Sequence, residues 1–186
     1  MLRMWCENIS AMKKVFAIFF VLLLFVTAGQ GAKLKKAVKM ANMSLSSPVF
    51  GNNEKLPVRF TGDGEGQSPP LAFRHVPKTA RSLALILDDP DVPIGTFTHW
   101  LIWNISPGTA GIKEGTLPAE AVEGKNTIGR TKYVPPRPPS GTHRYIFRLY
   151  ALDSVLALEP GADREGLENA LQGHIISQAE LIGKYR

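Results

Sequence analysis

Three apolar runs in the middle of the chain, at residues 83–87, 100–105 and 144–152, constrain its fold more than any other feature. They are rich in β-branched or aromatic residues and are bounded by Pro, Gly, Asp or Ser, which is typical of β-strands. Glycine and proline crowd residues 62–70 and 134–141 too densely for helices, so these segments must be ordered by packing against a sheet. The pattern predicts a mainly β fold with long irregular loops.

One helix is predicted near the C-terminus. Asp163 can cap its start, and Leu167, Leu171 and Ile175 recur at helical spacing after it. We expect this helix to lie over an edge or a face of the sheet. Residues 178–182 are predicted to continue it or to form a short second helix that stops at Gly183.

Acidic and histidine side chains gather beside the predicted strands. Asp89 and Asp91 flank Pro90 directly after the first strand, and His99 and His143 begin the second and third strands. Two residues two positions apart in an extended chain face the same side, so we expect the two carboxylates to need hydrogen-bond donors or an imidazolium nearby. Loops on a rigid sheet often hold functional residues, and this grouping predicts a small polar pocket. Aspartates next to proline are also ordinary turn formers, so a purely structural role for each acid remains open.

Strand alternation separates the residues around His143. His143 and Tyr145 point to one side of the predicted strand and Arg144 to the other. A neutral imidazole can donate one N–H to an anion while a carboxylate fixes its other nitrogen. We therefore expect His143 and Tyr145 to face the pocket, and Arg144 to pair with an acid, for which Asp91 is the candidate.

An ordered set of motifs carries a resemblance to a known family. The motifs are Asp89-Pro90-Asp91-Val92-Pro93, Thr98-His99-Trp100, Pro138-Pro139 and Gly141-Thr142-His143-Arg144-Tyr145, supported by Ser68-Pro69-Pro70-Leu71 and Leu181-Ile182-Gly183-Lys184-Tyr185. From about Leu45 to the C-terminus, the chain resembles the phosphatidylethanolamine-binding protein family, also called the Raf kinase inhibitor-like family, in its compact bacterial and archaeal form. The resemblance implies a β-sandwich-like fold with a few peripheral helices.

The resemblance also implies a pocket for phosphate-like head groups that needs no metal or cofactor. The residues that match this pocket are Asp89, His99, Pro138, Pro139, His143 and Tyr145, with Asp91 and Pro93 shaping the same loop. The chain departs from the family before the paired prolines, where it reads Val134-Pro135-Pro136-Arg137 instead of containing glycine. Two interpretations of Arg137 are open: it reaches over the mouth of the pocket and adds a contact to a phosphate or carboxylate, or it points into water.

The N-terminal part of the sequence has the layout of a secretory signal peptide. Met12-Lys13-Lys14 precedes an apolar run at residues 15–26, which small residues follow. We expect residues 1–31 to be a signal peptide with Met12 as the true start, residues 32–44 to be a basic tail, and residues 45–186 to be the domain. Removing residues 1–31 takes away three basic residues, one acidic residue and the only cysteine, Cys6, so the formal charge falls from +6 to +4. The product is predicted to be secreted or periplasmic and free of disulfides.

The preferred functional hypothesis is a secreted, non-enzymatic binding protein. Its pocket would take a small anion or a phosphorylated head group, and it would inhibit or regulate a protein partner such as a protease. The alternative is a hydrolase of a small phosphoester or ester in which His99 or His143 is the general base and Asp89 orients it. Against the alternative, no Ser, Thr or Cys nucleophile stands in a recognisable elbow beside the histidines.

Other classes of function are less favoured. Two histidines and a carboxylate can hold a metal, but these histidines lack a short helical spacing. Nucleic-acid binding is not expected, because the charge is modest and no recognised motif is present. Membrane contact is expected to be peripheral at most, through the basic tail, and a homodimer remains open.

Overall fold

The computed structural model describes residues 43–186, so the predicted signal peptide and nearly all of the predicted basic tail lie outside the described residues. The strands are β1 (Ser44–Ser46), β2 (Glu54–Lys55), β3 (Leu71–Arg74), β4 (Ser82–Asp89), β5 (Phe97–Ile105), β6 (Gly111–Ile112), β7 (Val122–Glu123), β8 (His143–Leu152) and β9 (Ile175–Tyr185). The helices within residues 43–186 are a single 3-10 turn, η1 (Val58–Phe60), and α2 (Arg164–Leu171). Within residues 43–186, no helix has the length and apolar character needed to cross a membrane.

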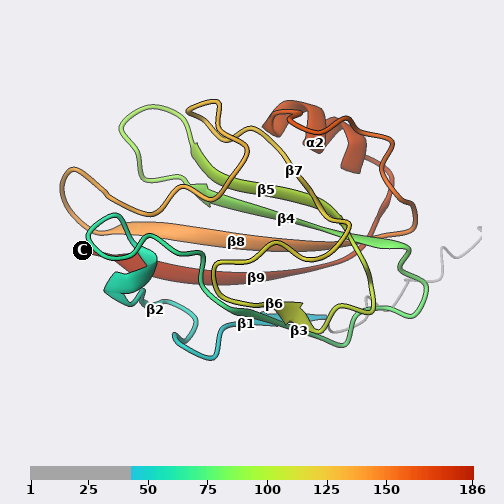
Figure 1. The fold of residues 1–186 in the computed structure, drawn as a ribbon, viewed down its shortest axis with the longest axis horizontal. Coiled ribbons are helices and arrows are strands. Elements are labelled where there is room, and N and C mark those ends of the chain that lie inside the picture. Colours follow the sequence, from blue (N-terminus) through green and yellow to red (C-terminus); the bar gives the residue numbers. More distant parts are fainter. Residues whose placement is uncertain (1–42) are drawn as a thin grey trace, which may run out of the picture. The chain divides into compact units, whose positions relative to one another are not determined.

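The strands form two sheets. The larger has the order β2-β9-β8-β4-β5-β7, in which only the β2–β9 pair is parallel, and the smaller is the antiparallel set β1-β3-β6. The small sheet lies against one face of the large sheet and α2 lies on the other side (Figure 1). The predicted mainly β, sandwich-like fold is confirmed.

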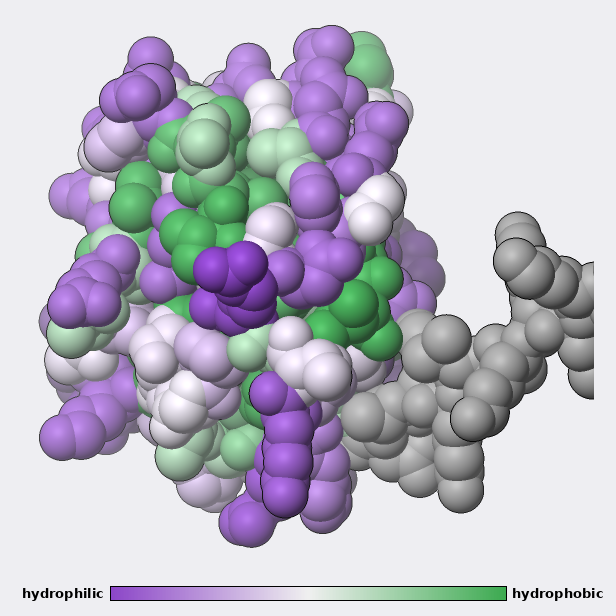
Figure 2. Space-filling view, turned by 90° about the vertical axis from the view of Figure 1, so that its right-hand side faces the viewer, coloured by the Kyte–Doolittle hydropathy of each residue, from purple (hydrophilic) through white to green (hydrophobic). Residues whose placement is uncertain are grey.

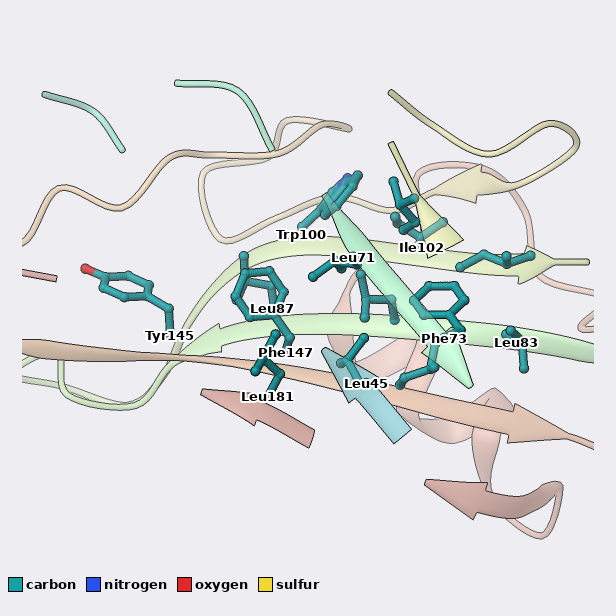
Figure 3. Close-up of a cluster of buried hydrophobic side chains, with 14 of the residues drawn as sticks. Leu45, Leu71, Phe73, Leu83, Leu87, Trp100, Ile102, Tyr145, Phe147 and Leu181 are labelled. Atoms are coloured by element: carbon teal, nitrogen blue, oxygen red, sulfur yellow. The ribbon is translucent and has the colours of Figure 1, made fainter. Parts of the chain in front are cut away.

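The large sheet is buried on both faces at its centre, which explains the near-continuous apolar sequence of β4. Leu83, Leu85 and Leu87 face the small sheet, whereas Ala84 and Ile86 face α2, and all eight residues of β4 are buried. Figure 3 shows the first of these clusters, in which side chains from the small sheet meet those of the large one. Burial of such side chains is the main favourable term in folding, at roughly 1.5–3 kcal/mol each.

The C-terminal region differs from its prediction. The helix is confirmed from its cap to Leu171, because α2 begins after Asp163, whose side chain accepts a hydrogen bond from Gly166 N. Ile175, which the spacing predicts on this helix, is instead the first residue of β9. The predicted helix at residues 178–182 is wrong, because these residues lie inside β9, which pairs with β8 along nearly its whole length. Gly183 is not a helix stop: it lies within this strand, and a Cβ there would come within 2.6 Å of the Leu56 side chain.

Antiparallel pairing places several strand ends at one end of the large sheet. β4 and β9 end there, whereas β5 and β8 begin there, with Asp89 opposite Phe97 and His143 opposite Tyr185. In Figure 1 this is the left end, where the C-terminus is marked. Figure 2 shows the opposite end, where a group of hydrophobic residues is bordered by hydrophilic ones. The fold thus brings the predicted acids and histidines together at a sheet end.

Candidate functional site

Asp89 and His143 form a buried carboxylate–imidazole pair. Nδ1 of His143 lies 2.7 Å from Oδ2 of Asp89, and the two side chains are 9% and 4% exposed, respectively. An ionised carboxylate only accepts hydrogen bonds, so Nδ1 of His143 carries the proton of this contact. Oδ1 of Asp89 accepts a second hydrogen bond from Asp91 N at 2.9 Å. Each oxygen of Asp89 thus accepts one hydrogen bond, and Nε2 of His143 has no partner among the described residues.

His99 is fixed in the same tautomer by a different acceptor. Its Nδ1 lies 2.7 Å from the carbonyl oxygen of Val134, and a carbonyl can only accept, so Nδ1 again carries the proton. Burial lowers the pKa of His99 below its usual value, although the Val134 carbonyl and the charge of Asp89 oppose this shift. His99 is therefore neutral at neutral pH, and its Nε2 presents a lone pair.

Tyr145 contributes the third polar group of the site. It is buried in β8, and its hydroxyl has no hydrogen-bond partner among the described residues. Figure 3 shows the ring at one end of the apolar cluster, with the hydroxyl pointing away from the neighbouring labelled side chains. Burial raises the pKa of Tyr145 most, and the nearby Asp89 carboxylate raises it further through its charge and through its proximity to the hydroxyl, so the hydroxyl stays protonated. A buried donor without a partner costs about 1–3 kcal/mol, which a ligand oxygen can recover.

These groups surround a cavity of about 270 Å³. Of the predicted site residues, it is lined by Asp89, His99, Arg137, Pro138, Pro139, His143 and Tyr145; four further lining residues were not predicted, namely Val92, Phe97, Val134 and Pro135. Phe97 could have been found from strand alternation, because it lies two positions before His99 and its ring centroid is 4.6 Å from that of His99. Among the residues that the structure describes, no group of three His, Cys, Asp or Glu side chains could hold a metal ion.

Asp91 and Pro93 do not line this cavity. They line a neighbouring groove with Arg144, which donates to Asp91 from its backbone N at 2.8 Å, from Nε at 2.9 Å and from Nη2 at 2.6 Å. The predicted Arg144–Asp91 pair is present, and hydrogen bonding from Arg144 lowers the pKa of Asp91 to about 2. The expectation that Asp89 and Asp91 face the same side is wrong, because the regular strand β4 ends at Asp89 and the two carboxylates contact different partners, His143 and Arg144.

Comparisons with known proteins identify the relatives of this chain. A sequence model of the family described as phosphatidylethanolamine-binding protein matches residues 46–186. The chain belongs to this family. A UPF0098 protein from Methanothermobacter thermautotrophicus is 50% identical over 149 residues, which cover 77% of this chain and 99% of that relative.

Two solved structures have folds similar to that of this member of the phosphatidylethanolamine-binding protein family. A family homologue from Chlamydia trachomatis has a TM-score of 0.75 at 45% identity, and the match covers 77% of this chain and 97% of that one. Escherichia coli YbcL, described as a new member of the mammalian family, has a TM-score of 0.73 at 25% identity, with 78% and 99% covered. The resemblance inferred from the motifs is confirmed, and family membership indicates a binding protein.

Arg137 combines features of the two interpretations, in which it either reaches over the mouth of the pocket or points into water. The residue lines the cavity, but its side chain is 71% exposed and Nε lies 3.5 Å from Oδ1 of Asp63. Asp63 also accepts hydrogen bonds from Tyr185 Oη at 2.8 Å and from Arg186 Nη2 at 3.3 Å, and these contacts lower its pKa, the bond from Tyr185 most of all. The charge of Arg137 is thus shared with an acid at the rim, and sequence reasoning missed Asp63 because it belongs to no motif.

Proposed function

We propose that this family member is a secreted, non-enzymatic binding protein whose cavity takes a small anion or a phosphorylated head group. The observation that carries the proposal is that three residues lining one cavity each have a polar atom without a protein partner among the described residues: Nε2 of His99, Nε2 of His143 and Oη of Tyr145. The cavity volume of 270 Å³ is at the lower limit of small-molecule sites, which are about 300–1,000 Å³. It suits a head group rather than a complete lipid.

The tautomers define what the ligand must supply. With both Nδ1 atoms engaged as donors, each neutral imidazole offers a lone pair to the cavity. An anion therefore binds together with one proton, which is either taken up on one of these lone pairs or brought by the ligand. Oη of Tyr145 donates in either case. The expected ligand is an anion whose binding is coupled to one proton.

The remaining parts of the proposal rest on the sequence. The lysine pair and apolar run before residue 27 support export, and export favours an extracellular or periplasmic partner such as a protease over a cytosolic kinase. We include inhibition or regulation of such a partner in the proposal, with peripheral membrane contact through the basic tail and homodimer formation as further elements. Nucleic acid is not among the proposed partners.

A hydrolase is the second candidate, because the Asp89–His143 pair has the arrangement of a general base and its orienting acid. No Ser, Thr or Cys lines the cavity within the described residues, so water would be the nucleophile. Incubation with a panel of phosphoesters and esters separates the two candidates. Turnover that is lost in His143→Ala would establish the hydrolase.

Titration calorimetry with inorganic phosphate and phosphoethanolamine tests the binding proposal. His143→Ala should weaken both ligands by about 10- to 150-fold, the equivalent of a charge-assisted hydrogen bond of about 1.5–3 kcal/mol. His75→Ala is the control, because His75 is exposed and lies outside the cavity. Equal losses in both variants, or no binding by the wild type, would place the ligand elsewhere.

A further inference from the structure

A second cleft, of about 480 Å³, lies on the other side of the segment that carries Val134. Val134 and Pro135 line both spaces, so this segment is the wall between the histidine cavity and the cleft. Trp100 and Tyr133 also line the cleft, and their rings meet edge to face with centroids 5.6 Å apart. The volume falls within the range of about 300–1,000 Å³ that is typical of small-molecule sites.

Glu123 supplies an unpaired negative charge to this cleft. It is half-buried in the short edge strand β7, and its Oε1 accepts a hydrogen bond from Trp100 Nε1 at 2.6 Å. Among the described residues, no lysine, arginine or histidine lies within ion-pair distance of its carboxylate. The other acid of the cleft, Glu65, is not free in this way, because it faces Arg59 at 3.8 Å. Oε2 of Glu123 is thus available to a cationic group.

Arg130 and Lys132 supply two positive charges to the same cleft. Both side chains are exposed and form no ion pair with any residue that the structure describes. Surface arginines and lysines are usually solvated. Arg130 and Lys132 therefore support a binding site only if the backbone that carries them is fixed.

Asn126 provides this fixation. It is 4% exposed, and its Oδ1 accepts from Ile128 N at 3.1 Å and from Arg130 N at 3.0 Å. Its Nδ2 donates to Lys132 O at 2.9 Å, and its backbone N donates to Arg130 O at 2.9 Å. One buried amide therefore holds the loop that carries both cations beside the cleft. Such preorganisation reduces the entropy that a binding site loses when a ligand is captured.

From this arrangement we infer that the cleft binds a small zwitterion that carries a primary ammonium and a carboxylate. The ammonium meets Oε2 of Glu123, and the carboxylate meets Arg130 and Lys132. Free α-amino acids and longer amino carboxylates share this chemistry and differ in the distance between the two charges. The site is separate from the proposed anion cavity, so the two can fail independently.

An NMR titration of the full chain with glycine, 4-aminobutyrate and 6-aminohexanoate tests this inference and reads the charge separation that fits. At least one of the three should shift the amides of Glu123 and of residues 130–132. Butyrate and butylamine, which each carry only one of the two charges, should bind at least about tenfold more weakly. A response to glycine alone identifies free α-amino acids as the class, and a response to a longer member identifies extended amino carboxylates.

Glu123→Gln is the decisive variant. It keeps an oxygen that accepts from Trp100 Nε1, so the fold should persist, but the affinity for the zwitterion should fall at least about tenfold. Glu159→Gln, a change at an exposed acid outside the cleft, is the matched control and should have no effect. Sulfate binding in the histidine cavity should be unchanged in Glu123→Gln. The inference is overturned if none of the three amino carboxylates binds, if Glu123→Gln binds as the wild type does, or if the shifts surround His99 and His143 instead.

Discussion

Replacement of Asp89 by asparagine should change which nitrogen of His143 carries the proton. In the wild type, Oδ2 of Asp89 accepts from His143 Nδ1 at 2.7 Å and Oδ1 accepts from Asp91 N at 2.9 Å. In Asp89→Asn, the amide oxygen can keep the Asp91 contact, which turns the amide NH₂ toward His143. Nδ1 must then accept, and the proton of the neutral ring moves to Nε2, which faces the cavity.

Two effects of this change favour an anion at high pH. The cavity gains an N–H donor that needs no proton from solution, and it loses the buried negative charge of Asp89. A hydrogen bond to a charged group contributes about 1.5–3 kcal/mol, so Asp89→Asn should bind an anion about 10- to 150-fold more tightly than the wild type at about pH 8. In the wild type the binding of sulfate takes up one proton, so affinity should fall by up to about tenfold per pH unit as the pH rises.

Titration calorimetry with sulfate at about pH 5.5 and about pH 8 measures this effect, because the charge of sulfate is constant over that range. The wild type should lose affinity between the two values, whereas Asp89→Asn should keep it. Asp153→Asn is a matched control, because Asp153 contacts Nδ1 of His174 at 2.8 Å in the same way, but on the exposed surface. If Asp89→Asn loses affinity in parallel with the wild type, the assignment of the tautomers is wrong.

Four further outcomes are expected. Asp91→Asn should lower the free energy of unfolding by about 1–2 kcal/mol at pH 7. Since the pKa of Asp91 is lowered to about 2, the difference in unfolding free energy between wild type and variant, measured in urea, should shrink as the pH falls from 3.8 toward 2. Because burial lowers the pKa of His99, the unfolded chain binds a proton at a higher pH than the folded chain does. The free energy of unfolding should therefore decrease below about pH 6.5, by at most about 1.4 kcal/mol per pH unit. His99→Gln should reduce this slope in urea unfolding. Arg137→Gln should weaken sulfate by no more than about fivefold in calorimetry, because its charge is exposed and shared with an acid. N-terminal sequencing of the protein recovered from its native host should find a start near Ala32 or Lys33.

The parts of the fold that could be predicted are those in which burial dictates the residue types. β4 is buried on both faces, so its central residues 83–87 are all apolar, and β5 and β8 carry similar apolar runs. β9 was missed because its sequence contains good helix formers such as Gln178, Ala179 and Glu180, and local propensity gives way to pairing with β8. Its buried positions, including Ser177, Leu181 and Tyr185, are separated by even numbers of residues, which is the period of a strand.

The site was predictable in its composition and less so in its geometry. The order of the motifs and the positions of the strand starts were enough to predict that His99, His143 and Asp89 line one cavity. The separation of Asp91 from the cavity depends on where β4 ends, and the contact of Arg137 depends on Asp63, which is remote in sequence. Neither the position of Asp91 nor the Arg137–Asp63 contact produces a pattern of local spacing in the sequence. Neither could therefore be predicted without the conformation of the loops.

The Asp89→Asn variant also separates binding from hydrolysis, because a general base needs Nε2 of His143 without a proton, whereas an anion binds better when Nε2 carries one. A general base must take a proton from water at Nε2, and it can do so only while Asp89 holds the proton of His143 on Nδ1. Asp89→Asn moves that proton to Nε2, so a hydrolase would lose turnover at about pH 8. An anion-binding protein would gain affinity under the same conditions, because the cavity has gained a donor. The same substitution therefore gives effects of opposite sign, and a rise in sulfate affinity without measurable turnover in either protein would identify the cavity as a binding site.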